Sequence, residues 1–179
     1  MKQNTKKLTA IIMMMLVIAT ACNNHDSNKV PEKGISVGSA DKGAQIGSLG
    51  LNTVNDGLTV KDNHLTIDGK RMENTDVQIG SKIGVVFEGV GGLKEKDGKV
   101  FPRIELIVLD EATNMPVFQK EDLLLKSDAG YSVNEASVLS GYFTIDNSFK
   151  QGHSYKLAIN VSDREGTGGI LSTISVKVK

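Results

Sequence analysis

The sequence predicts an all-β protein whose main body is a sandwich of two sheets. Three observations support this class. Short runs of alternating apolar and polar residues recur from residue 58 onward, as strands with one buried face require. Glycine is frequent, at 19 of 179 residues, and many glycines separate these runs where tight turns are expected. No helical pattern of about ten residues or more interrupts the chain beyond its amino-terminal segment, which argues against an α/β architecture.

Residues 1–21 predict an export signal. Lys2, Lys6 and Lys7 form a basic start, and an apolar run that ends at Ala21 follows. About 14 apolar residues at ~1.5 Å each reach only ~21 Å, which is short of the ~30 Å hydrocarbon core of a bilayer. The segment is therefore expected to be a cleaved signal peptide and not a membrane-spanning helix.

The single cysteine of the chain, Cys22, follows this segment directly. Residues 16–22 read L-V-I-A-T-A-C and resemble the lipobox of bacterial lipoproteins, although that pattern more often has leucine where Ala19 stands. The resemblance implies thioether diacylation of Cys22, cleavage before it and acylation of the new amino terminus. An ordinary secretory signal with a cysteine nearby by chance is the alternative. If Cys22 is acylated, no thiol remains for a disulfide, so the fold must rest on core burial.

Residues 22–47 are predicted to be a flexible tether. They are polar or small and lack hydrophobic periodicity, so little apolar area offsets the entropy of ordering them. The stretch Gly34–Gly38 matches the G-x-S-x-G pattern of a nucleophile elbow, which needs a strand before it and a helix after it. Neither element is expected here, so we interpret the stretch as linker.

Residues 48–72 are predicted to form a β-hairpin that packs on the sandwich. Two alternating runs, Leu58–Val60 and Leu65–Ile67, flank the polar loop Lys61–His64, and Asp68-Gly69 marks a further turn. A lone hairpin is marginally stable in water, so this one must pack on, or extend, a larger sheet.

Residues 73–179 are predicted to form the sandwich itself, with about seven or eight strands and turns every 8–12 residues, the pattern of an immunoglobulin-like sandwich. Strands are expected at 77–79, 83–87, 104–109, 116–119, 139–145, 155–162 and 170–178. The strand at 104–109 is the most apolar and is expected in a sheet interior, and the last two are expected to pair as a hairpin. Residues 121–125 fit either a short strand or one helical turn, and residues 126–138 are expected to be irregular.

The last two predicted strands carry a family resemblance. Residues 152–163 followed by residues 170–178 resemble the end of bacterial immunoglobulin-like and cadherin-like domains, in which Tyr155 takes the place of a corner tyrosine. The chain as a whole resembles small Bacteroidota envelope lipoproteins, because a lipobox and a tether precede a β-sandwich. The resemblance names no activity.

The cadherin resemblance also implies a calcium motif, because Asp163-Arg164-Glu165 looks like part of one. Calcium takes about six to eight oxygen ligands, usually from carboxylates on several loops. The chain has no tandem repeat to share such a site, so we interpret Asp163 and Glu165 as turn residues with a solvated Arg164 between them.

Composition and charge exclude several classes of function. The 21 basic and 21 acidic residues balance, so loss of the three signal lysines leaves a net charge of about −3 and no basic patch for nucleic acid. The histidines, His25, His64 and His153, are expected in the tether and in two turns, without the spacing of a zinc site. We therefore predict no catalytic residue, no metal and no cofactor.

The glycine-rich segment Gly89–Val100 is the predicted contact region. It lacks the pattern of a phosphate-binding loop, so we expect a mobile connection of the kind that carries recognition in sandwich folds.

The sequence thus predicts a lipid-anchored, non-enzymatic envelope protein that contacts another protein or helps to assemble a complex. An outer-membrane location, on its periplasmic or surface face, is favoured because Asn23 and not aspartate follows the cysteine. One alternative is a small-ligand or glycan-binding lipoprotein that serves a transport system, for which Tyr131 or Tyr142 should line a pocket, although aromatic residues are scarce. Another is a hydrolase, which needs convergent titratable side chains in a cleft.

Overall fold

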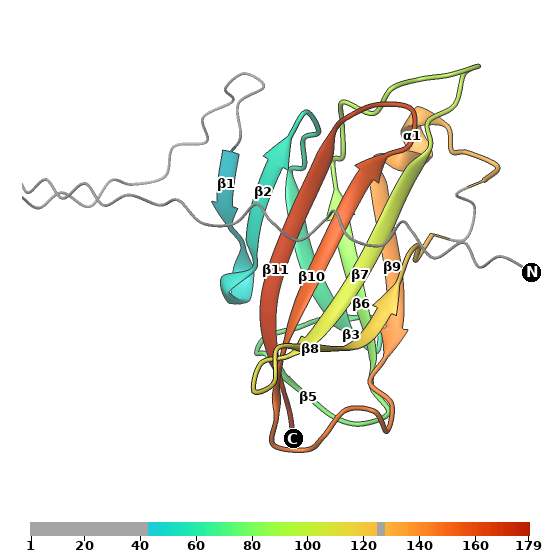
Figure 1. Ribbon diagram of the computed structural model, residues 1–179. Helices are drawn as coiled ribbons and strands as arrows, with labels where there is room; N and C mark the ends of the chain where they lie inside the picture. Colours follow the sequence, from blue (N-terminus) through green and yellow to red (C-terminus); the bar gives the residue numbers. More distant parts are fainter. Residues whose placement is uncertain (1–42, 125–127) are drawn as a thin grey trace, which may run out of the picture. The chain divides into compact units, whose positions relative to one another are not determined.

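The computed structural model describes residues 43–124 and 128–179, which form a sandwich of two largely antiparallel sheets (Figure 1). The predicted signal peptide, the Cys22 lipidation site, the tether up to residue 42 with its G-x-S-x-G pattern, and His25 lie outside these residues. Within the described ranges, no helix has the length and apolar character needed to cross a membrane.

The larger sheet has the strand order β1-β2-β11-β10-β7-β8, and the short strand β5 pairs in parallel with the end of β11. Its strands are β1 (Gly43–Ile46), β2 (Asn52–Asp56), β5 (Asp76–Val77), β7 (Pro102–Asp110), β8 (Met115–Lys120), β10 (Ser154–Asp163) and β11 (Gly169–Val178). The predicted carboxy-terminal hairpin is confirmed as β10 and β11. The apolar strand β7 is interior, as expected, since β10 and β8 flank it.

The smaller sheet has the order β4-β3-β6-β9 and lies behind the larger one in Figure 1. Its strands are β3 (Asp62–Ile67), β4 (Lys70–Arg71), β6 (Lys82–Glu88) and β9 (Val138–Thr144), so the strands predicted around 83–87 and 139–145 are confirmed. Two short helices, η1 (Ser48–Gly50) and α1 (Val133–Ala136), complete the described elements.

The core fills the space between the facing sides of the two sheets. Alternate residues of β7 and β10 are buried, because successive side chains of a strand point to opposite faces. The largest fully buried side chains come from both sheets and their connections: Tyr155, Phe87, Phe149, Leu51, Leu58, Ile83, Ile104, Leu106, Leu139, Ile145, Leu157 and Ile159. The alternation in the sequence thus identified the inward face of these strands correctly.

A buried polar cluster links the two sheets. Asn63 of β3 donates from Nδ2 to Thr53 Oγ1 of β2 at 2.7 Å and to Ser172 Oγ of β11 at 2.8 Å. The two hydroxyls are themselves 2.9 Å apart and hydrogen-bonded. Because each buried polar group has partners, the cluster is tolerated in the core and constrains how the sheets face each other.

Tyr155 takes the corner position that the sequence predicted for it. Its hydroxyl accepts a hydrogen bond of 2.6 Å from the backbone N–H of Lys150, five residues upstream. Its ring meets the ring of Phe149 edge-on, with centroids 5.0 Å apart. A tyrosine near the start of a strand, bonded back to the preceding connection, is the geometry expected of a corner tyrosine.

The hairpin predicted for residues 48–72 is wrong. Three strands lie in this segment: β2 joins the larger sheet, whereas β3 and β4 pair across the predicted Asp68-Gly69 turn in the smaller one. Leu58–Val60 is not a strand, although Leu58 and Val60 are buried and Thr59 between them forms an isolated bridge with Gly91. The expected loop residues 62–64 belong to β3, because pairing with β6 continues from Ile67 to Asp62 and Asn63 bonds inside the core.

Other boundaries also differ from expectation. The end of the predicted tether forms β1, whose backbone pairs with β2 while its residues 44–46 stay exposed. A strand without a buried face has no hydrophobic pattern from which the sequence could predict it. The strand expected at 77–79 is reduced to β5, and the predicted turn at Gly80-Ser81 follows it. Residues 121–124 form neither a strand nor a helical turn, and the irregular segment 126–138 contains α1.

Candidate functional site

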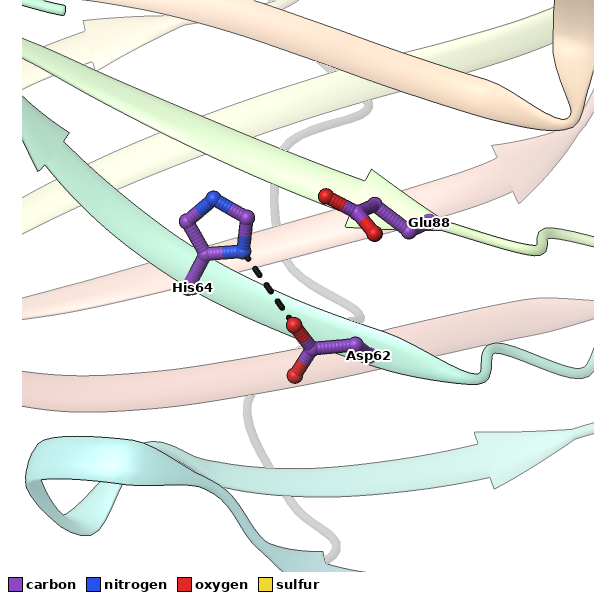
Figure 2. Close-up of side chains that lie close together, drawn as sticks. All are labelled: Asp62, His64 and Glu88. Atoms are coloured by element: carbon purple, nitrogen blue, oxygen red, sulfur yellow. Dashed lines mark ion pairs between the residues drawn. The ribbon is translucent and has the colours of Figure 1, made fainter. Parts of the chain in front are cut away.

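Titratable side chains gather on the outer face of the smaller sheet. Asp62 and His64 of β3 lie beside Glu88 of β6 (Figure 2). One ligand atom from each side chain lies within 4.8 Å of the other two, which makes this the one group of at least three potential metal ligands among residues 43–124 and 128–179.

The register of the sheet creates this cluster. Asp62 and His64 are two positions apart on one strand, so they share a face, while Asn63 between them points into the core. Glu88 stands directly opposite Asp62 on the neighbouring antiparallel strand. Side chains directly opposite in an antiparallel pair lie close enough to interact. Three residues separated by up to 26 positions thus meet because β3 and β6 pair in this register.

His64 is buried, and its Nδ1 atom has no hydrogen-bond partner. Only 9 % of the residue is exposed, although it sits on the outer face of the sheet. Nδ1 lies 3.4 Å from Asp62 Oδ2, which is close enough for an ion pair but outside good hydrogen-bond geometry. Figure 2 shows the Glu88 carboxylate turned toward the imidazole from the other strand. The next outer-face residue of β3, Thr66, likewise has a buried Oγ1 without a hydrogen-bond partner.

Arg71 of β4 contacts the solvent side of the cluster. Its Nη2 donates to both oxygens of Asp62, at 3.0 and 3.3 Å. Both side chains of this pair are about half exposed, so the attraction is screened by water. The cluster with Arg71 thus brings two acidic side chains and one basic side chain together with the histidine.

An aromatic surface adjoins the cluster on the same face. Tyr142 of β9 is 46 % exposed, and Lys82 Nζ lies 4.5 Å from the centre of its ring. Gly84 stands opposite Tyr142, and a Cβ at Gly84 would lie 2.7 Å from the tyrosine ring, so glycine allows the ring to lie across the sheet. Tyr131, the other candidate ligand-binding tyrosine, is partly buried against the core.

A second histidine–carboxylate pair joins β7 to the start of β10. His153 Nδ1 is hydrogen-bonded to Asp110 Oδ2 at 3.0 Å, and Asp110 Oδ1 accepts from the Ala112 N–H at 2.8 Å. Burial of Asp110 raises its pKa, but the Ala112 N–H and His153 together outweigh burial and lower the pKa below its ordinary value. A shallow depression here is lined by Glu111, Ala112, Gly152, His153 and Ser154, and neither candidate tyrosine lines it.

Asp163 connects two loops through hydrogen bonds from their backbones. Its Oδ2 accepts from the Lys94 N–H at 2.6 Å and its Oδ1 accepts from the Glu165 N–H at 3.1 Å. Glu165 in turn pairs with Lys96 at 3.1 Å. The predicted turn position is wrong for Asp163, which is the last residue of β10, whereas Glu165 lies in the bend that follows the strand. A calcium ion at Asp163 would have to displace the two N–H donors.

Two expectations about these loops are wrong. Arg164 is not merely solvated, since its Nη1 pairs with Asp128 at 2.9 Å. The contact segment Gly89–Val100 is not a free connection, because backbone hydrogen bonds tie it to Thr59, to Ser137 and to Tyr131.

The sequence missed the cluster because it placed His64 in a turn as a solvated side chain. His64 instead lies in β3 and is buried. The D-x-H spacing was a usable signal once residues 62–64 were taken as strand, since it puts both side chains on one face. The contribution of Glu88 could be found only from the pairing of β3 with β6. His153 lies before β10, as expected for a turn residue, but it is half-buried and bonded.

The chain matches no model of a known protein family, and no curated protein is significantly similar to it.

Proposed function

We propose that this protein is a lipid-anchored, non-enzymatic protein of the bacterial cell envelope, of the Bacteroidota type, and that its β-sandwich is a protein-interaction or assembly module. Acylation of Cys22 in the lipobox-like segment would hold it at a membrane, since each buried CH₂ contributes ~0.8 kcal/mol and several chains make release negligible. The outer membrane is the proposed location, because Asn23 follows the acylated residue.

One observation supports the interaction role above all others. Apolar side chains are exposed together at one edge of the larger sheet, and we name Ile46, Val54 and Leu171 the edge patch. They are 83 %, 38 % and 46 % exposed. Val54 pairs directly with Leu171, and Ile46 lies on the adjoining strand β1. Contiguous exposed apolar side chains are typical of interaction surfaces.

The strand at this edge adds a second means of contact. Among the described residues, β1 pairs with β2 alone, so no described strand covers its outer backbone groups. Such an edge accepts an extended segment from a partner by strand addition, in which main-chain hydrogen bonds supply affinity and side-chain contacts supply specificity. The proposed partner is therefore an envelope protein that presents an extended, partly apolar segment.

The strand arrangement supports an immunoglobulin-like interpretation of the sandwich. Strands β11, β10, β7 and β8 adjoin in that order, and β6 pairs with β9 in the opposite sheet. The parallel contact of β5 with β11 and the corner geometry of Tyr155 fit the same interpretation. Many cell-surface domains with this architecture work by binding and not by catalysis.

The interaction role is tested by photocrosslinking in living cells, with a photoreactive residue in place of Leu171. Position 147, an exposed residue in the β9–β10 connection, serves as the control. We expect a specific protein adduct from position 171 that position 147 does not give, and the substitution Val54→Asp should weaken it. Equal labelling from both positions would contradict the proposal.

The anchor is tested separately by the intact mass of the mature protein. We expect the mass of an acylated amino-terminal cysteine, and a Cys22→Ser variant that stays unprocessed. An unmodified thiol at Cys22 in the mature protein would rule out the anchor without bearing on the edge patch.

The alternative of a small-ligand or glycan-binding lipoprotein for a transport system has one observation in its favour. Tyr142 offers an exposed ring beside Lys82, and aromatic faces stack on sugars. Ligand-induced shifts of the Tyr142 resonances on titration with glycans would support this function in place of the first.

A further inference from the structure

We propose that Asp62, His64 and Glu88 bind a divalent transition-metal ion of the zinc class on the outer face of the smaller sheet. The proposal rests on the geometry of the cluster and on the state of its histidine, and it does not depend on the function proposed above.

The spacing of the first two ligand atoms suits zinc better than it suits a hydrogen bond. Zinc binds histidine nitrogen and carboxylate oxygen at ~2.1 Å, so two ligands at a tetrahedral angle lie ~3.4 Å apart. His64 Nδ1 and Asp62 Oδ2 are 3.4 Å apart. A hydrogen bond between such atoms would bring them to ~2.9 Å. The pair is thus held near the separation that a shared ion requires.

Glu88 completes a three-ligand set. Its carboxylate lies within 4.8 Å of the other two ligand atoms and is turned toward His64 (Figure 2). Glu88 is exposed at the end of β6, so a change of side-chain rotamer can bring an oxygen onto the ion. The backbone of β3 and β6, paired in register, needs no rearrangement.

The second, independent observation is the unpartnered nitrogen of His64. A buried polar atom without a hydrogen-bond partner is rare in folded proteins, because no bond compensates for its desolvation. Nδ1 is such an atom, on a side chain that is about nine-tenths buried and directed toward Asp62. An ion bound to Nδ1 would satisfy this atom.

The donor set selects the class of ion. Calcium and magnesium prefer oxygen ligands in sets of six or more, whereas an imidazole with carboxylates suits zinc and its neighbours in the first transition row. Three protein ligands would leave a fourth position for water or for an atom of a partner. Asp62 and Glu88 are both accessible to solvent, which gives an ion a route to the site.

Arg71 competes with the ion for the carboxylate of Asp62. It donates to both oxygens of Asp62, so a metal must take one of these oxygens from it. Because Arg71 is half exposed on the two-residue strand β4, its side chain can withdraw into solvent. Removal of the guanidinium should therefore strengthen metal binding, whereas it would weaken a cluster that served structure alone.

The test is Zn²⁺ binding to the full-length protein, purified without metal and carrying Cys22→Ser so that no thiol competes. Calorimetric titration and equilibrium dialysis give affinity and stoichiometry. We expect one Zn²⁺ per chain, and His64→Gln and Glu88→Gln to weaken it by about tenfold or more, as loss of groups that hold a metal does. Arg71→Gln should strengthen binding by a few-fold, and Ca²⁺ should not compete.

The matched control is His153→Gln, which alters the other histidine–carboxylate pair and should leave Zn²⁺ binding unchanged. Glu88→Gln guards against a folding artefact, because this side chain is exposed, and the melting temperature of each variant is measured without metal. Failure of the parent protein to bind Zn²⁺ at micromolar concentration would overturn the proposal. Equal effects of His64→Gln and His153→Gln, or weaker binding by Arg71→Gln, would also overturn it.

Discussion

His64 and His153, the histidines among the described residues, each lie beside an aspartate, yet the two pairs differ in kind. His153 is hydrogen-bonded to Asp110 at 3.0 Å, and the carboxylate also accepts from a backbone N–H. His64 stands 3.4 Å from Asp62 without a hydrogen bond, and that carboxylate instead accepts from Arg71. In the first pair the carboxylate is buried and the histidine partly exposed, whereas in the second pair these roles are reversed.

The Asp110–His153 pair is therefore a structural contact, which we call the structural joint. The cluster around His64 is a candidate binding site. At His153 the hydrogen-bonding needs of the buried carboxylate are met within the protein, so the pair fastens β7 to the start of β10. At His64 a buried nitrogen remains unpaired, and its neighbours are exposed charges. Unsatisfied buried polar atoms are few in folded proteins, and a ligand bound to Nδ1 would explain this one.

The largest effect on stability is expected from Tyr155→Phe, next to the structural joint. Tyr155 stacks near His153, and its hydroxyl accepts from the Lys150 N–H in a partly buried bond. Removal of the hydroxyl leaves this donor unsatisfied, and we expect a loss of ~1–3 kcal/mol in the free energy of unfolding, measured by urea denaturation. Tyr142→Phe, on an exposed ring, is the control and should change stability by less than about 0.5 kcal/mol. Equal losses would contradict the assignment of Tyr155 as a corner residue.

The paired substitutions Asp110→Asn and Asp62→Asn compare the two sites directly. Asp110→Asn weakens the bonds to Ala112 and His153, whereas Asp62→Asn weakens a contact with Arg71 that water screens. We expect a clear fall in melting temperature for Asp110→Asn and a smaller change for Asp62→Asn in metal-free protein. The reverse order would mean that the outer-face cluster, and not His153, is the structural joint.

A pH series tests the same carboxylate by linkage. The pKa of Asp110 is lowered in the fold, because hydrogen bonds from the Ala112 N–H and His153 outweigh the opposing effect of burial. The ionised group therefore contributes stability above its unfolded pKa of ~3.9, and this contribution is lost as pH falls through the lower folded value. The stability difference between the parent and Asp110→Asn should shrink below about pH 4. A difference that does not shrink as the pH falls below about 4 would contradict this cause.

The smallest effect, and the opposite sign, is expected for Thr66→Val beside His64. The Thr66 hydroxyl is buried without a partner, so a methyl group of similar shape removes an unsatisfied atom and keeps the packing. We expect a gain of ~0–1 kcal/mol in the free energy of unfolding. A clear loss of stability would show that the Thr66 hydroxyl has a hydrogen-bond partner in solution. It would then count against an unsatisfied polar atom at this position.

Strand prediction succeeded where burial has a two-residue period. β10 and β11 were located because their apolar residues alternate and their inner faces meet the core. It failed at Leu58–Val60, where buried residues alternate outside any strand, and at β1, whose residues 44–46 are all exposed. The alternation of apolar residues indicates which side chains are buried. It does not indicate which backbone segments pair with one another.

The sequence by itself determined the all-β class, the inward face of the long strands and the carboxy-terminal hairpin, because each depends on local patterns. The tertiary structure alone decided that residues 48–72 divide between two sheets, that Asn63 meets Thr53 and Ser172, and that Glu88 meets His64. These contacts follow from strand register, since a shift of one residue would turn each of these side chains to the opposite face.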